Sequence, residues 1–214
     1  MNFEWTSNEI ATAEAELVRR ASGLAPLVER WGPCTLPSRR EPVAGHFEAL
    51  ASSIVYQQLA GRAAAAIWGR VQGLAPGAFL AERVVLLQPQ ALRSAGLSGA
   101  KAAAVADLAA RVVGGALDLD QVAALDDEEV IARLSEVRGI GRWTAQMFLI
   151  FRLGRLDVWP AGDLGVRRGY AVIHELDEAP GPTALEALGD TFRPWRSIMA
   201  WYCWRALDTS PARV

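Results

Sequence analysis

The segment Val137–Phe148, VRGIGRWTAQMF, places two glycines and two arginines between stretches of helical periodicity. Gly139 and Gly141 permit a turn with positive φ and the close approach of another molecule. The helix after the turn would present unpaired backbone N–H groups and the positive end of its dipole, which suit a phosphate. Arg138 and Arg142 add positive charge locally. The pattern predicts either a phosphate-binding hairpin or a tight corner between two helices.

A carboxylate stands in a second informative position about twenty residues later. Asp163 lies in a loop with Pro160, Gly162 and Gly165, directly before the apolar-periodic run LGVRRGYAVI. Judged by residue type alone, an aspartate at this place is a helix N-cap, because its side chain accepts a hydrogen bond from the first turn.

The charge balance restricts how the chain could bind phosphates. The sequence has 22 Lys and Arg against 24 Asp and Glu, a formal net charge of -2. Histone-like binding of nucleic acid depends on a broad positive field, so any phosphate contact here must be local. Lys101 is the only lysine, which limits amine chemistry to one side chain.

Metal centres and export signals are not indicated. Cys34, Cys203, His46 and His174 lie far apart and lack the paired spacing of zinc or iron–sulfur ligands, so we expect no protein-ligated metal. The first residues are acidic where a secretory signal is basic, and no apolar run reaches membrane-spanning length. We therefore expect a cytoplasmic protein.

The elements that must position these residues are helices. Residues 8–22 and 45–72 have helical spacing, and residues 23–45, with four prolines, are predicted to be mostly an irregular connection. Asp126 is a predicted N-cap, and residues 182–208 predict two helices. No region alternates with the period of several strands, so the predicted fold is all-α.

The chain contains a weak internal repeat. Leu92–Val105 and Leu134–Met147 both predict a helix, a glycine-containing turn and another helix. Two ordinary helical hairpins explain the likeness, and no function is inferred from it.

The longer pattern around the glycines resembles the helix-hairpin-helix motif of DNA-binding proteins. It is formed by Leu134, Val137, Gly139, Ile140, Gly141, Thr144 and Ala145. Together with Asp163 and the segments SIVYQQLAGRAAAAIWGRV, DVWPAGDLGVRRG and FRPWRSIMAWYCWRAL, the chain resembles the helix-hairpin-helix (HhH-GPD) DNA glycosylase superfamily, in its 3-methyladenine DNA glycosylase II branch. The resemblance covers roughly residues 45–207.

The resemblance implies two helical domains with a cleft between them. Residues 46–151 would form a central helical barrel that ends in the helix-hairpin-helix at 134–151. Residues 1–45 and 152–214 would form the second domain, and the extra amino-terminal β-domain of some members has no room. The implied partner is double-stranded DNA with damaged bases, bound by a monomer without an obligate protein partner or a membrane. No cofactor is implied, apart from a possible monovalent cation on the hairpin carbonyls when DNA is bound.

The resemblance also assigns site residues. Asp163 matches the catalytic carboxylate, and the base pocket would be lined by Trp143, Met147, Trp204 and Tyr56. Contacts to DNA would come from Arg138, Gly139, Ile140, Gly141, Arg142 and Thr144. Gln58, with Leu59 next to it, would fill the gap left by a flipped base. The alternatives are core packing for the tryptophans and contact with other helices for Gln58 and Leu59. Arg167 and Arg168 either meet DNA or face solvent.

The implied reaction is hydrolysis of the N-glycosidic bond of alkylated purines such as 3-methyladenine and 7-methylguanine, which leaves an abasic site. Trp143 occupies the hairpin position where members with lyase activity carry lysine, so we expect no strand cleavage. Met147 stands where some relatives place tyrosine, and Arg138 stands where the hairpin often begins with proline.

Three other interpretations remain open. The chain could excise a neutral lesion such as uracil, hypoxanthine or an oxidised purine, although no acid beside the hairpin is evident for protonating a neutral leaving group. It could be a non-catalytic DNA-binding protein that uses the hairpin only as a clamp. It could also be a purely structural helical protein.

Overall fold

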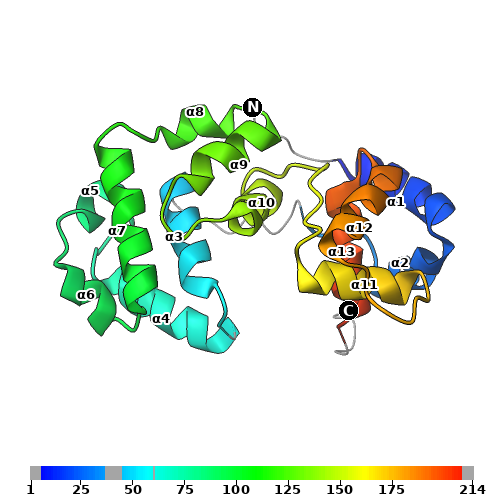
Figure 1. Ribbon diagram of the computed structural model, residues 1–214, viewed down its shortest axis with the longest axis horizontal. Helices are drawn as coiled ribbons and strands as arrows, with labels where there is room; N and C mark the ends of the chain where they lie inside the picture. Colours follow the sequence, from blue (N-terminus) through cyan, green and yellow to red (C-terminus); the bar gives the residue numbers. More distant parts are fainter. Residues whose placement is uncertain (1–5, 37–44, 60, 209–214) are drawn as a thin grey trace. The chain divides into compact units, whose positions relative to one another are not determined.

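The computed structural model describes residues 6–36, 45–59 and 61–208 (Figure 1). Every regular element in these ranges is a helix, which confirms the predicted all-α class. None of these helices is long and apolar enough to cross a membrane. The chain divides into two compact units, one of residues 41–153 and the other of residues 1–40 with 154–214.

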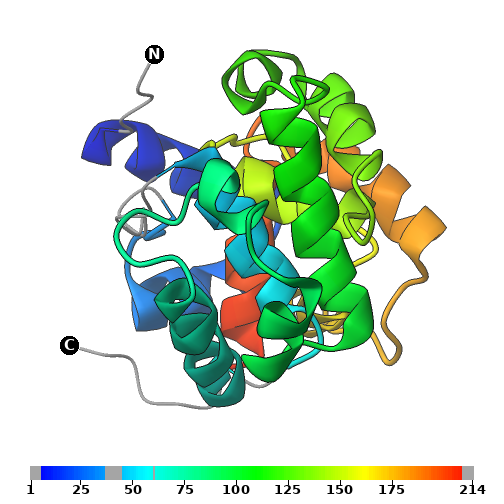
Figure 2. The same cartoon turned by 90° about the vertical axis from the view of Figure 1, so that its left-hand side faces the viewer.

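The unit of residues 41–153 is one continuous stretch of chain. Its helices are α3 (His46–Tyr56), α4 (Gly61–Gly73), α5 (Ala81–Val84), α6 (Pro89–Ser94), α7 (Gly99–Val113), α8 (Leu119–Ala123), α9 (Asp127–Ser135) and α10 (Arg142–Phe151). The long α7, drawn in green in Figure 2, contacts α3, α5 and α6, and α3 also contacts α4 and α10. Leu50, Ile54, Leu108, Leu134 and Phe148 are buried in the core that these contacts enclose.

The other unit is built from both ends of the chain. Its elements are α1 (Ser7–Arg20), η1 (Ser22–Leu24), α2 (Ala25–Trp31), α11 (Leu164–Ile173), α12 (Pro182–Gly189), η3 (Asp190–Phe192) and α13 (Arg196–Ala206). Helix α13 contacts α11, α2 and α1, so it lies at the centre of this unit (Figure 1). Leu17, Phe192, Met199 and Tyr202 are fully buried there.

Helices α11 and α13 cross at very short range because α11 carries a glycine at the crossing. A Cβ atom on Gly169 would lie 1.9 Å from the backbone oxygen of Cys203. No side chain fits into such a gap, so only glycine allows the two backbones to meet. The crossing fixes the position of the first turn of α11 relative to the side chains of α13.

The structure differs from the sequence prediction in two places. Residues 23–45 include helix α2, in which Pro26 stands in the first turn, where its fixed φ and missing N–H do not disturb a helix. The prediction treated this proline as a loop signal. The helical run predicted over 45–72 is interrupted, because α3 ends at Tyr56 and Gln58 has a positive φ of 54°.

Candidate functional site

Asp163 is the N-cap of α11, as its residue type predicted, and it makes a second contact as well. Its Oδ1 atom accepts a hydrogen bond from the backbone N–H of Val166 at 2.8 Å. The same oxygen accepts a hydrogen bond from the indole Nε1–H of Trp204, on α13, at 3.0 Å. Two donors from two helices therefore fix the rotation of this carboxylate.

Gly165 gives the indole the room to reach Asp163. A Cβ atom at residue 165 would lie 2.8 Å from Cδ1 of Trp204 and 3.0 Å from Oδ1 of Asp163. Any larger residue would therefore displace the indole from the first turn of α11. The signal in the sequence is the spacing of Gly165 and Gly169, four positions apart on α11.

The loop before Asp163 is held by the first turn of α13. Arg196 donates to both carboxylate oxygens of Asp157, at 2.7 and 3.0 Å. The hydroxyl of Ser197 donates to the backbone oxygen of Arg155 at 2.7 Å and accepts from the N–H of Val158 at 3.1 Å. Because Arg196 and Ser197 are buried, these bonds make the loop a rigid support for the carboxylate.

The neighbours of Asp163 on α11 and α13 do not compete for its role. Burial, and then the negative charge of Asp163, raises the pKa of the Cys203 thiol, which therefore stays protonated at neutral pH. Arg167 donates through Nε to the backbone oxygen of Pro180 at 2.7 Å and secures the loop after α11. Arg168 is exposed.

The hairpin between α9 and α10 needs Gly139 for its own fold. Gly139 has a φ of +78°, which L-residues with a side chain rarely adopt. A Cβ atom there would lie 2.9 Å from Cβ of Ala104, on α7. Ile140 is buried and its N–H donates to the backbone oxygen of Val137 at 3.1 Å, which closes the turn.

Nothing in the fold of the hairpin requires glycine at position 141. It is the N-cap of α10 with a φ of -100°, and a Cβ atom there would meet nothing within 4 Å. Serine or aspartate would stabilise this end of the helix over glycine by a few tenths of a kcal/mol and would satisfy an N–H group of the first turn, yet the position carries no side-chain cap. An uncapped helix start beside open space is the local geometry that accepts an outside anion.

The two arginines of the hairpin have different surroundings. The backbone N–H of Arg138 donates to Oδ2 of Asp107 at 2.8 Å, and this bond, with Arg111, holds the pKa of the Asp107 carboxyl below its usual value. The side chain of Arg138 is exposed. Arg142 forms two hydrogen bonds with the carboxylate of Glu128, at 2.8 and 2.5 Å.

Two residues predicted to contact DNA have buried side chains. Ile140 packs inside the hairpin, and the hydroxyl of Thr144 accepts a hydrogen bond from Nε2 of Gln57 at 3.0 Å. Both side chains turn into the protein, so contact of these two residues with DNA stays a prediction that concerns their backbone groups. Only their backbone groups can face a ligand.

Gln58 and Leu59, the predicted wedge, lie in the turn after α3 and are both exposed. This geometry differs from the alternative in which they face other helices. The sequence analysis missed Gln57, which donates from Nε2 to the backbone oxygen of Gly139 at 3.0 Å and so joins the turn to the hairpin. Because Gln57 and Gln58 are adjacent residues of the same type, the sequence does not indicate which of the two side chains points into the protein.

The residues predicted to line a base pocket belong to different units. Tyr56 and Trp143, at the end of α3 and in the first turn of α10, are exposed to 40% and 43%. Met147 lies one turn after Trp143 on α10 and is half-buried. Trp204 is in the other unit, where it holds Asp163.

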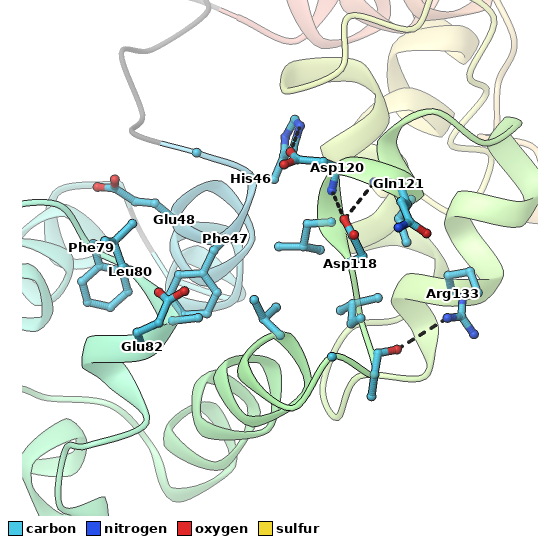
Figure 3. A pocket seen from close by; sticks show the side chains of 18 of the residues that line it. His46, Phe47, Glu48, Phe79, Leu80, Glu82, Asp118, Asp120, Gln121 and Arg133 are labelled. Carbon is cyan, nitrogen blue, oxygen red and sulfur yellow. Dashed lines mark hydrogen bonds and ion pairs between the residues drawn. The ribbon is translucent and has the colours of Figure 1, made fainter.

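A separate pocket of about 590 Å³ lies among α3, α5, α7 and α8 (Figure 3). Four carboxylate residues line it, namely Glu48, Glu82, Asp118 and Asp120. Burial and then Arg152 lower the pKa of His46, so that Arg133 is the one pocket residue that stays positive at neutral pH. A surface of this charge repels phosphate, and we do not assign it to nucleic acid.

No metal-binding cluster is found within the part of the chain that the structure describes. There is no group of three or more His, Cys, Asp or Glu side chains there that could hold an ion.

Comparisons with known proteins identify the family of the chain. The family model of the HhH-GPD superfamily base excision DNA repair proteins matches residues 51–194, and the chain belongs to this family. The DNA-3-methyladenine glycosylase 1 of Schizosaccharomyces pombe is 34% identical over 185 residues, which cover 85% of this chain and 79% of that protein.

Two solved structures are similar over nearly the whole chain. The S. pombe 3-methyladenine DNA glycosylase in complex with abasic DNA has a TM-score of 0.79 and 30% identity, and the match covers 90% of this chain and 95% of that one. The DNA-3-methyladenine glycosidase from Bacillus halodurans has a TM-score of 0.80 and 36% identity, with 92% and 89% covered.

Proposed function

We propose that the protein is a DNA glycosylase of base excision repair that hydrolyses the N-glycosidic bond of alkylated purines and leaves an abasic site. The observation that carries the proposal is the carboxylate of Asp163, held through Oδ1 by the N-terminus of α11 and by the Trp204 indole. This carboxylate lies in a chain of the HhH-GPD family, and its similar relatives are named 3-methyladenine DNA glycosylases.

The chemistry that Asp163 supports is stabilisation of positive charge on the sugar. Departure of the base leaves an oxocarbenium-like centre, and a carboxylate with fixed orientation stabilises that centre without first having to reorganise. Asp163 also orients the water that attacks the sugar and accepts its proton. An N3- or N7-alkylated purine carries a positive charge and leaves readily, so the reaction needs no strong acid in the pocket.

The hairpin supplies the phosphate contact that the weakly acidic chain requires. The uncapped start of α10 at Gly141 and the exposed side chain of Arg138 provide backbone donors and a cation at one place. For a protein carboxylate to reach the glycosidic bond, the base must leave the helical stack, which costs a few kcal/mol. The exposed Gln58 is the side chain that we assign to the vacated space.

We further propose that the enzyme has no lyase activity. A glycosylase that nicks DNA attacks the sugar with an amine, and Lys101 is the only lysine of the chain. Burial lowers the pKa of Lys101, but its ammonium group donates to the backbone oxygens of Val55 and Gln57, at 2.8 and 2.5 Å. Trp143 stands at the hairpin position where a lysine would be needed.

The decisive experiment compares base release by the wild type and by Asp163→Asn on methylated duplex DNA. Asparagine is as good an N-cap as aspartate, so the substitution keeps α11 and removes only the negative charge. Asp126→Asn is the matched control, because Asp126 caps α9 through the same kind of bond, 2.9 Å to the N–H of Glu129. Freed bases are identified by chromatography, and strand breaks are counted before and after alkali.

The expected result is release of 3-methyladenine and 7-methylguanine by the wild type and by Asp126→Asn, none by Asp163→Asn, and strand breaks only after alkali. Breaks without alkali, or a borohydride-trapped adduct, would refute the absence of lyase activity. Release of uracil, hypoxanthine or oxidised purines in place of alkylated ones would refute the substrate class. Binding of duplex DNA without release of any base would show a non-catalytic DNA-binding protein and would refute the proposed function.

A further inference from the structure

The turn after α3 holds its exposed residue in an unfavourable backbone conformation. Gln58 has a φ of +54°, and among the described residues Glu175 is the other non-glycine with a positive φ. A residue with a side chain keeps this conformation only where its surroundings enforce it, and such positions concentrate at functional sites. Two groups hold the turn in place here.

The first group is the ammonium of Lys101, which lies on α7. It donates to the backbone oxygen of Val55, one of the last carbonyls of α3, at 2.8 Å, and to that of Gln57 at 2.5 Å. The carbonyl of Gln57 belongs to the peptide group that precedes Gln58. Fixing this oxygen restrains the plane of that peptide group, which is one of the two planes whose relative rotation defines the φ angle of Gln58. Lys101 therefore acts as a clamp on the turn.

The second group is the side chain of Gln57. Its Nε2 donates to the backbone oxygen of Gly139 and to the hydroxyl of Thr144, both at 3.0 Å. Gly139 and Thr144 lie on the two sides of the phosphate-binding turn of the hairpin. Gln57 thus links the turn that carries Gln58 to the hairpin, within one compact unit.

We propose that Lys101 and Gln57 are positioning residues for base flipping, which hold Gln58 ready to enter the DNA stack while the hairpin binds the backbone. This inference rests on the proposed function. It assigns the only lysine of the chain to the flipping step and not to bond cleavage. It also predicts that the benefit of Lys101 depends on how firmly the target base is paired.

The test compares Lys101→Met with the wild type under single-turnover conditions on two duplexes. One holds 7-methylguanine opposite cytosine, and the other holds it opposite a stable abasic analogue, where flipping costs less. Lys101→Arg keeps the donors. Arg70→Met is the matched control, because Arg70 is likewise a cation that donates to the backbone of this unit, to the oxygen of Ala95 at 2.8 Å, away from the turn.

We expect Lys101→Met to lower the rate roughly tenfold or more on the paired lesion, a factor typical of releasing one strained backbone position. On the unpaired lesion we expect about the wild-type rate. Lys101→Arg should recover most of the lost rate. Arg70→Met should change the rate on both duplexes by the same factor. An equal loss on both duplexes, or no loss on either, overturns the proposal. If Lys101→Met does not fold, Gln57→Leu is measured in its place against the same criterion.

A second readout does not need base release. With Asp163→Asn as the background, 2-aminopurine beside the lesion reports separation of the stacked bases, and anisotropy reports binding. The inference is supported if Asp163→Asn gives a fluorescence rise at saturating protein and the added Lys101→Met abolishes it. This holds even if the wild type releases no base, because absence of base release would overturn only the proposed function. If the double variant Lys101→Met, Asp163→Asn gives the same fluorescence rise as Asp163→Asn alone, the positioning role is refuted, even where base release is normal.

Discussion

Gly165→Ala tests the contact between Trp204 and Asp163 without replacing either residue. The new Cβ would lie 2.8 Å from Cδ1 of Trp204, whereas ordinary contacts begin at 3.4 Å. The indole must therefore retreat by about 0.6 Å, which stretches the 3.0 Å hydrogen bond to Asp163 beyond bonding range. The carboxylate then loses the donor from α13.

The expected cost is catalytic. A hydrogen bond to a charged group contributes about 1.5–3 kcal/mol, so its loss at the transition state lowers the rate of base release by roughly 10- to 100-fold. Stability should change little, because Trp204 is only half-buried and alanine favours a helix by up to ~1 kcal/mol over glycine. Single-turnover release of 7-methylguanine measures the rate, and thermal unfolding measures the stability.

Gly169→Ala, one helical turn later, supplies the contrast. Its Cβ would lie 1.9 Å from a backbone oxygen of α13, which no rotamer can relieve, so unfolding should become easier by about 3 kcal/mol. If Gly165→Ala keeps the wild-type rate, or loses as much stability as Gly169→Ala, the positioning of Asp163 by Trp204 has been misjudged.

Three further results are expected. Gly139→Ala should destabilise the fold by about 1–3 kcal/mol in a denaturant titration, because of its positive φ and the 2.9 Å approach to Ala104. Gly141→Ala should cost less than about 1 kcal/mol, because alanine is a poorer N-cap than glycine but meets no neighbour there, and it should bind duplex DNA more weakly. Burial lowers the pKa of His174, so near this pKa the unfolded chain binds more protons than the folded one. The stability should therefore fall as the pH drops below about 6.5, the ordinary pKa of histidine. His174→Leu should flatten that part of a profile of melting temperature against pH. Arg138→Ala should reduce the slope of log binding constant against log salt by about 1 in anisotropy titrations, and an unchanged slope would remove Arg138 from the interface.

The fold was predictable from the sequence where local chemistry determines it. Helical periodicity and the absence of alternation predicted an all-α chain, and Asp126 and Asp163 cap helices as their residue types require. Gly139 turned out to be necessary for the hairpin corner. Helix α2 was missed because proline has opposite meanings at the start of a helix and in its interior.

The site was predictable only in part, because long-range contacts leave no local pattern. Nothing in the neighbourhood of Trp204 indicates that its indole donates to a carboxylate 41 positions away. Gln57 and Gln58 are adjacent residues of the same type, yet one binds the hairpin and the other is exposed, since the end of α3 falls between them. Thr144 fits the motif by type, but its hydroxyl points into the protein.

The ion pair of Arg142 and Glu128 bears on how the protein would search DNA. Both side chains are exposed, to 53% and 69%, and a pair of this kind contributes only about 0–1 kcal/mol. A phosphate can displace Glu128 at small cost, and Glu128 can recapture the arginine when the phosphate leaves. Such an exchange would shorten each stay on undamaged DNA, so that the residence time would depend more on whether a base enters the protein than on the phosphate contact of Arg142.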